Sequence, residues 1–142
     1  MKIIPYLHFN GNCAQAIALY EKAFGVQAQV LRYKDTPPSE DYQPPAGTED
    51  FVMHACLTNR NDYTIYLCDM PPETSSSFGN GMSISVELDS KEKVQSAFEV
   101  LKEHGAVGMD PQQTFWSPYF ASLTDQFGVA WMISMEYCEG AE

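Results

Sequence analysis

One order of predicted strands and helices occurs twice along this chain, and this repeat constrains the fold more than any other sequence feature. Each copy reads strand, helix and then three strands. The copies span about residues 1–70 and 82–137, and a Pro-, Gly- and Ser-rich linker at 71–81 joins them. Because one copy is too small to bury its sheet alone, we expect both within a single α+β domain over residues 1–142. The paired βαβββ modules would then form a curved eight-stranded mixed sheet, with helices outside and a cup inside.

The elements of the first copy follow from its periodicity and its turn residues. Strands are expected at 3–9, 27–34, 51–58 and 63–69, and a helix between Asn12 and Gly25. Apolar residues spaced three and four apart give that helix one buried face. Asn12 is a predicted N-cap with Gln15 as its capping-box partner, and Gly25 is the predicted C′ residue. Residues 35–50 contain four prolines and predict a long surface loop.

The second copy repeats this pattern with different end signals. Strands are expected at 82–88, 106–109, 119–124 and 129–137. The helix is expected to start after Asp89 or Ser90, with Asp89 and Glu92 at capping-box spacing. It is expected to run to about His104, with Gly105 as the C′ residue.

Side chains alternate between the two faces of each strand. One face is apolar and should pack on the helices, and the other, the mixed face, carries both polar and apolar side chains. The mixed face is expected to line the cup, although a plain solvated face is the simpler interpretation. Four residues of this face are candidates for binding a small molecule, with Trp116 as a wall of the pocket. Trp116 fits a core or dimer position equally well. The mixed set of the later strands of both copies is Val52, His54, Cys56, Thr64, Tyr66, Cys68, Ser83, Ser85, Glu87, Ala130, Met132, Ser134 and Glu136; the candidates are His54, Tyr66, Ser83 and Met132.

Charge and composition exclude several classes of partner. The formal net charge is −11, so we expect no nucleic-acid binding and no docking on anionic membranes. The segment 1–12 resembles a strand rather than a signal peptide, which predicts a cytoplasmic protein. The four cysteines form no CxxC pair and are expected to be reduced.

Several motifs together make the chain similar to a known family: PYLxFNGNC at 5–13, AIxxY at 16–20, AFG at 23–25, VMHA at 52–55, TFW at 114–116, Phe120, and TDxFGVxWMI at 124–133. It resembles the PhnB-like proteins of the glyoxalase/bleomycin resistance/dioxygenase superfamily, also called vicinal oxygen chelate (VOC), over nearly its whole length. Ser117 and Ala121 depart from the pattern, because the family tends to have glycine there.

The resemblance implies a homodimer and, in the metalloenzymes of the superfamily, a divalent metal held by His and Glu side chains from four strands. Transferring those four positions gives Pro5, Tyr66, Ser83 and Met132. None of these is an ordinary ligand for such a metal, so we expect no metal and no cofactor.

The first strand leaves its register open. The transferred register places Pro5, Leu7 and Phe9 in the cup, whereas polarity places Tyr6 and His8 there. If His8 faces inward, an alternative metal-ligand set consists of His8, His54, Glu87 and Glu136.

Three functions remain open at this point. The leading hypothesis is a small-molecule-binding protein without the usual metal site, with catalysis unassigned. The alternative is a metal-dependent lyase, isomerase, transferase or dioxygenase that uses the relocated His/Glu set. The third is an assembly role for a Pro-rich arm at 36–46.

Other catalytic chemistry finds less support in the sequence. Glu87 and His54 are the candidates for metal-free acid–base chemistry. Asp125 is expected to be an Asx-turn residue. Cys56 and Cys68 show no adjacent base that would make them nucleophiles. The absence of a Gly-rich cofactor loop argues against a methyltransferase.

Overall fold

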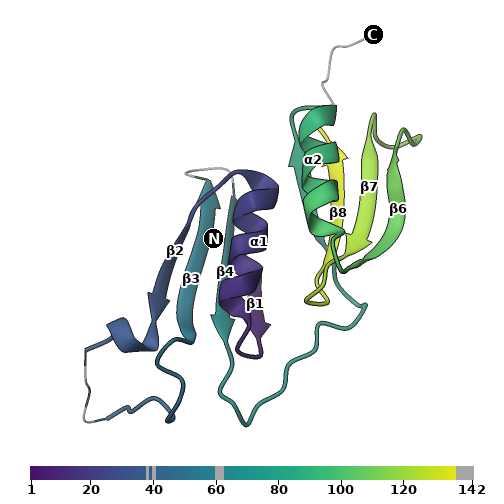
Figure 1. Ribbon diagram of the computed structural model, residues 1–142. Helices are drawn as coiled ribbons and strands as arrows, with labels where there is room; N and C mark the ends of the chain where they lie inside the picture. The colour runs from purple at the N-terminus through teal and green to yellow at the C-terminus, as the bar shows by residue number, and fades with distance from the viewer. Residues whose placement is uncertain (38, 40, 60–62, 137–142) are drawn as a thin grey trace. The chain divides into compact units, whose positions relative to one another are not determined.

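The computed structural model describes residues 1–37, 39, 41–59 and 63–136, and its contacts divide into two compact units. The N-terminal unit contains Met1–Glu21 and Gly25–Ser76, and the C-terminal unit contains Lys22–Phe24 and the chain from Ser77 onward. Each unit has its own four-stranded sheet (Figure 1). That the chain forms a single domain stays a prediction. No helix within the described ranges is long and apolar enough to cross a membrane.

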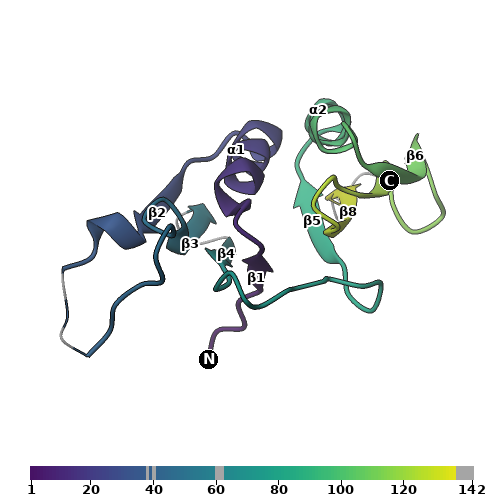
Figure 2. The same ribbon diagram turned by 60° about the horizontal axis from the view of Figure 1, so that its bottom comes forward.

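The N-terminal sheet has the strand order β1-β4-β3-β2, with β1 parallel to β4 and the other pairs antiparallel. The helix α1 lies over one face of this sheet (Figures 1 and 2). Its predicted apolar stripe is buried, with Cys13, Ala16 and Tyr20 fully inaccessible. The elements are β1 (Tyr6–Phe9), α1 (Cys13–Phe24), β2 (Ala28–Arg32), the 3-10 helix η1 (Tyr33–Asp35), β3 (Val52–Asn59) and β4 (Tyr63–Asp69).

The C-terminal sheet repeats that topology, which confirms the α+β class and the two βαβββ modules. Its order is β5-β8-β7-β6, again with the first pair parallel. The helix α2 covers one face through Val94, Ala97, Phe98 and Leu101, all buried (Figure 2). The elements are β5 (Ile84–Leu88), α2 (Lys91–Leu101), β6 (Ala106–Gln112), β7 (Phe120–Thr124) and β8 (Ala130–Met135). Tyr137, in the last predicted strand, lies outside the described residues, as do Pro38 and Glu40 of the predicted arm.

The start of α1 differs from its predicted cap, whereas α2 uses one of its two predicted caps. Asn12 occupies the N-cap position of α1, but its side chain accepts a hydrogen bond from the Asn10 amide instead of from the helix. The buried Asp69 carboxylate accepts the Cys13 amide, at 3.0 Å, in its place. At α2, Ser90 is the cap and accepts from the Lys93 amide. The Asp89–Glu92 capping box was therefore wrong.

The two helix ends differ as well. Gly25 has the predicted left-handed conformation, and its amide donates to the Glu21 carbonyl. The helix α2 stops at Leu101, earlier than predicted, and the left-handed residue after it is His104 rather than Gly105. Gly105 has another role, because a Cβ there would collide with the Thr124 carbonyl oxygen.

The first strand has the register that polarity predicted. Leu7 and Phe9 are buried, whereas Tyr6 and His8 are exposed on the opposite face. The transferred register, with Leu7 and Phe9 lining a cup, is therefore wrong. In β4, β5 and β8, the mixed side chains alternate with less exposed apolar ones as expected. Val52 was expected on the mixed face but is fully buried, beside a register shift in the β2–β3 ladder.

Candidate functional site

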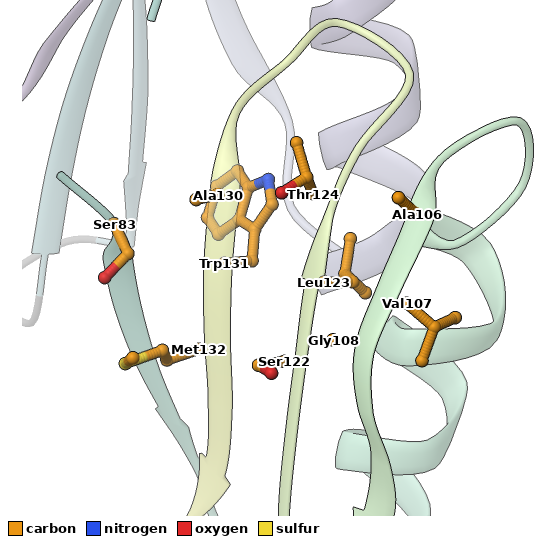
Figure 3. Close-up of a pocket in the computed structure, with 10 residues that line it drawn as sticks. All are labelled: Ser83, Ala106, Val107, Gly108, Ser122, Leu123, Thr124, Ala130, Trp131 and Met132. Carbon is orange, nitrogen blue, oxygen red and sulfur yellow. The ribbon is translucent and has the colours of Figure 1, made fainter. Parts of the chain in front are cut away.

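A pocket of about 280 Å³ lies on the C-terminal unit, across β6, β7, β8 and the residue before β5 (Figure 3). Its lining residues come from three neighbouring strands, the edge strand β6 among them, and from the residue before β5. Figure 3 shows Ser83 and Met132 side by side at one edge of it. The lining residues are Ser83, Ala106, Val107, Gly108, Ser122, Leu123, Thr124, Ala130, Trp131 and Met132.

Gly108 allows β6 to approach β7 at this pocket. A Cβ on Gly108 would lie 2.7 Å from the Ser122 Oγ, which is closer than real contacts allow. The β6–β7 ladder also shifts register between Val107 and Met109. The position of the Ser122 hydroxyl therefore depends on the missing side chain at Gly108.

The chemistry of the lining is polar but uncharged. Ser83, Ser122 and Thr124 bring hydroxyl groups, which both donate and accept hydrogen bonds. Met132 brings a flexible thioether and is 43% exposed. None of the ten lining residues carries an ionisable side chain of the Asp, Glu, His, Lys or Arg type. Such a surface favours a neutral, partly apolar molecule over an ion.

The open face of the N-terminal sheet carries a cluster of rings from β1, β3 and β4. His54 and Tyr66 contact each other with ring centroids 4.7 Å apart. The Tyr6 Oη lies 2.9 Å from the His54 Nδ1, within hydrogen-bond distance. The Tyr6 ring also contacts the rings of Tyr66, at 5.5 Å, and His8, at 5.0 Å. We call Tyr6, His8, His54 and Tyr66 the aromatic cluster.

The surroundings of this cluster keep its nearby acids protonated. Burial, followed by the neighbouring Cys68, raises the pKa of the Tyr6 phenol. Burial also raises the pKa of the Cys68 thiol, although its hydrogen bond with Tyr6 acts in the opposite direction. A protonated thiol is a poor nucleophile, so this raised pKa disfavours the thiolate form of Cys68 that nucleophilic catalysis would need.

The five predicted site residues divide into two pairs and one separate residue. His54 and Tyr66 lie together in the N-terminal unit, and Ser83 and Met132 together line the pocket of the C-terminal unit. Trp116 lies between β6 and β7, half-exposed at 51%, and does not line that pocket. Its ring contacts those of Phe115 and Phe120.

Ser117, one of the two departures from the family pattern, ties down the backbone beside Trp116. Its side chain is buried, and its hydroxyl donates to the Tyr119 carbonyl at 3.0 Å. Its amide donates to the Thr114 Oγ1. The serine thus fixes a turn where a glycine would leave the chain freer. Ala121, the other departure, is fully buried in β7.

Sequence reasoning missed Asp69 and the Gly108–Ser122 contact. Asp69 accepts amide hydrogen bonds from Cys13 and Val52, so it joins the start of α1 to the start of β3. The only indication of this role in the sequence was that Asp69 is an acidic residue at the end of a predicted strand. The Asx turn at Asp125 was predicted and is confirmed by its 2.8 Å bond from the Phe127 amide.

The residues at the transferred metal positions do not fit a divalent metal. Pro5 has no side-chain donor atom, Met132 offers a thioether, and Tyr66 and Ser83 offer hydroxyls. The alternative set is divided between the units, with His8 and His54 in the first and Glu87 and Glu136 in the second. Across the described part of the chain, no three His, Cys, Asp or Glu side chains group as metal ligands would.

Comparison with known proteins decides the family. The model of the Glyoxalase/Bleomycin resistance protein/Dioxygenase superfamily matches residues 2–133. The chain belongs to this superfamily. The resemblance inferred from the motifs is thereby confirmed, and solved structures similar to this superfamily member include a PhnB protein.

Three relatives show how close the similarity is. Protein YjdN from Escherichia coli (strain K12) is 30% identical in an alignment 142 residues long, which covers 95% of this chain and 95% of that protein. The crystal structure of protein PA1353 from Pseudomonas aeruginosa matches with a TM-score of 0.81 and 36% identity, over 96% of this chain and 98% of that one. The PhnB protein from Bacillus cereus matches with a TM-score of 0.73 and 26% identity, over 96% of this chain and all of that one (100%).

Proposed function

We propose that this superfamily member binds an uncharged small molecule on the open faces of its sheets and does so without the metal positions of the metalloenzymes. The observation that carries the proposal is the pocket of about 280 Å³ on the C-terminal sheet. Ser83 and Met132, two of the five residues predicted from the sequence, line it. We propose that the remaining three also contact bound ligand: His54 and Tyr66 from the open face of the N-terminal sheet, and Trp116 from the segment between β6 and β7.

The charge of the protein supports a neutral ligand. The net charge of −11 repels anions at long range. A local cluster of Lys or Arg would be needed to reverse that effect, and the pocket lining contains neither. A neutral molecule pays no such penalty and gains from contact with Met132 and the hydroxyls.

Native mass spectrometry of the untagged protein tests the proposal directly. We expect a co-purifying organic molecule that is released on denaturation. A Ser122→Leu variant should lose it, because the larger side chain fills the pocket. The matched control is Ser77→Leu, the same change at an exposed linker position of the same unit, outside the pocket and off the sheet. Loss of the molecule from both variants, or from neither, contradicts binding in this pocket.

Metal analysis of the same sample tests the alternative enzyme. Less than about 0.1 metal per chain excludes the relocated His8, His54, Glu87 and Glu136 set. Stoichiometric zinc, nickel, manganese or iron, lost on mutating His54, supports a metal-dependent lyase, isomerase, transferase or dioxygenase instead.

We further propose that the protein is a homodimer, as the family resemblance implies, and that it is cytoplasmic, as the sequence of its first strand predicts. Light scattering of the purified chain distinguishes twice the monomer mass from one. A monomer at working concentrations contradicts the dimer, and it also removes support from an assembly role for the 36–46 arm.

A further inference from the structure

We infer that Tyr6 is a positioning residue that holds His54 as the Nε2–H tautomer, so that the open face of the N-terminal sheet presents a hydrogen-bond donor to a carbonyl-type oxygen of an uncharged ligand. This inference rests on the proposed function, which it deepens by naming the group that is recognised. Tyr6 appeared in the sequence only as a question of strand register. The structure places its hydroxyl 2.9 Å from the His54 Nδ1.

The direction of the Tyr6–His54 hydrogen bond follows from the chemistry of the two groups. In a neutral imidazole, one nitrogen carries the proton and the other has a basic lone pair. A phenol oxygen is a weaker acceptor, because its lone pair is delocalised into the ring. The favoured arrangement is therefore the Tyr6 O–H donating to the His54 Nδ1. The imidazole proton must then lie on Nε2.

The local packing supports the same arrangement. Cys68 also forms a hydrogen bond with the Tyr6 phenol, and the Cys68 thiol can be its donor, which leaves the phenol proton for the His54 Nδ1. The rings of Tyr6 and Tyr66 both contact the imidazole, with centroids at 5.7 and 4.7 Å, and restrict its rotation. The strand register places Tyr6 opposite Tyr66 and Tyr66 opposite Cys56, so three adjacent strands hold the cluster.

The donor and its neighbours define a class of ligand. A neutral Nε2–H can only donate, so it requires an acceptor on the ligand, such as the oxygen of a carbonyl, amide or nitro group. Two tyrosine rings beside it favour a flat, partly aromatic molecule. A full negative charge on the ligand is disfavoured by the net charge of −11.

The first experiment reads the tautomer in the ligand-free protein. Long-range ¹H–¹⁵N correlation of the ring nitrogens at about pH 8.5, where imidazoles are ordinarily neutral, distinguishes the two tautomers. A His54→Gln spectrum assigns the His54 signals among the three histidines. We expect Nε2–H to dominate, and the ratio of the tautomers to fall about three- to tenfold in Tyr6→Phe, as for one hydrogen bond. Tyr66→Phe is the matched control, because it keeps a ring against the imidazole and leaves Tyr6 in place.

The second experiment adds two probes of equal shape. Acetophenone carries a carbonyl oxygen, and α-methylstyrene carries a CH₂ group in its place. Acetophenone should shift the His54 Nε2 signal saturably, and more weakly in Tyr6→Phe, whereas α-methylstyrene should not shift it.

Either of two results overturns the inference. One is a dominant Nδ1–H tautomer, or a ratio that is the same in the wild type and Tyr6→Phe. The other is the expected tautomer without an acetophenone shift at His54. The tautomer is read without any ligand, so this part of the inference can fail while small molecules still bind the protein. A failure of the proposed function differs, because then no probe binds either unit.

Discussion

The indole Nε1 of Trp131 donates a hydrogen bond to the Asp125 Oδ2, at 2.9 Å, inside the C-terminal unit. Both side chains are buried. The other oxygen of Asp125 accepts the amides of Phe127 and Val129. One carboxylate therefore fixes the turn before β8 and the largest core side chain in that strand, whose neighbours Ala130 and Met132 line the pocket.

Replacing Asp125 with alanine is expected to destabilise the fold by about 2–4 kcal/mol, because two buried N–H donors, those of Val129 and Trp131, and the part-buried Phe127 amide lose this acceptor. Urea unfolding followed by tryptophan fluorescence measures the change. Asp110→Ala removes an acidic side chain from an exposed position of β6 and should change stability by less than about 0.5 kcal/mol. Equal effects of the two variants contradict a structural role for Asp125.

Gly108→Ala is expected to cost about 1–3 kcal/mol, because the new Cβ meets the Ser122 Oγ. Ser122→Ala removes that atom, so the double variant should recover part of the loss. A double-mutant cycle should give a coupling energy above about 0.5 kcal/mol. Gly81→Ala is the control, since nothing lies within 4 Å of a Cβ there. Purely additive effects at Gly108 and Ser122 argue against the close approach.

Asp69→Asn should destabilise the N-terminal unit by about 1–3 kcal/mol. The carboxylate accepts from the Cys13 and Val52 amides with separate oxygens, and an asparagine NH₂ would face one of those donors. Hydrogen exchange should show faster opening at the start of α1 and at β3. Unchanged exchange at both places would show that the two contacts contribute nothing.

The buried Cys13 thiol is expected to lower the free energy of unfolding at alkaline pH. Burial raises the pKa of its thiol, so folding favours the neutral form. This contribution is complete below the unfolded-state pKa of about 8.5 and is lost as the pH rises above it, by up to about 1.4 kcal/mol per pH unit. Comparing the wild type with Cys13→Ala at about pH 7 and pH 10 cancels other groups. If the free energy of unfolding changes with pH in the same way in both proteins, the predicted contribution of Cys13 is refuted.

Local patterns in the sequence predicted most of the fold. Both βαβββ modules and the buried faces of α1 and α2 follow from periodicities of two and 3.6 residues. The register of β1 also followed from polarity, whereas transfer from the family gave the wrong answer. The helix caps were harder to predict, because the acceptor for Cys13 is Asp69, which is 56 residues away along the chain.

The site was only partly predictable, because its contacts also join residues that are far apart along the chain. Strand alternation indicated which face His54, Tyr66, Ser83 and Met132 occupy. It could not indicate that Tyr6 reaches His54, since those residues come from strands far apart in the sequence. Nor could it indicate that Gly108 makes room for Ser122, because that contact depends on a register shift between β6 and β7.

The most direct test of the central claim is an NMR titration of the backbone amides with benzamide and benzoate, two probes that differ mainly in charge. Benzamide should shift residues around Ser83, Ser122 and Met132 saturably, and this response should vanish in Ser122→Leu but persist in Ser77→Leu. Benzoate should bind much more weakly. If benzamide leaves the pocket residues unmoved, or if benzoate binds there as well as benzamide does, a site for uncharged molecules is contradicted.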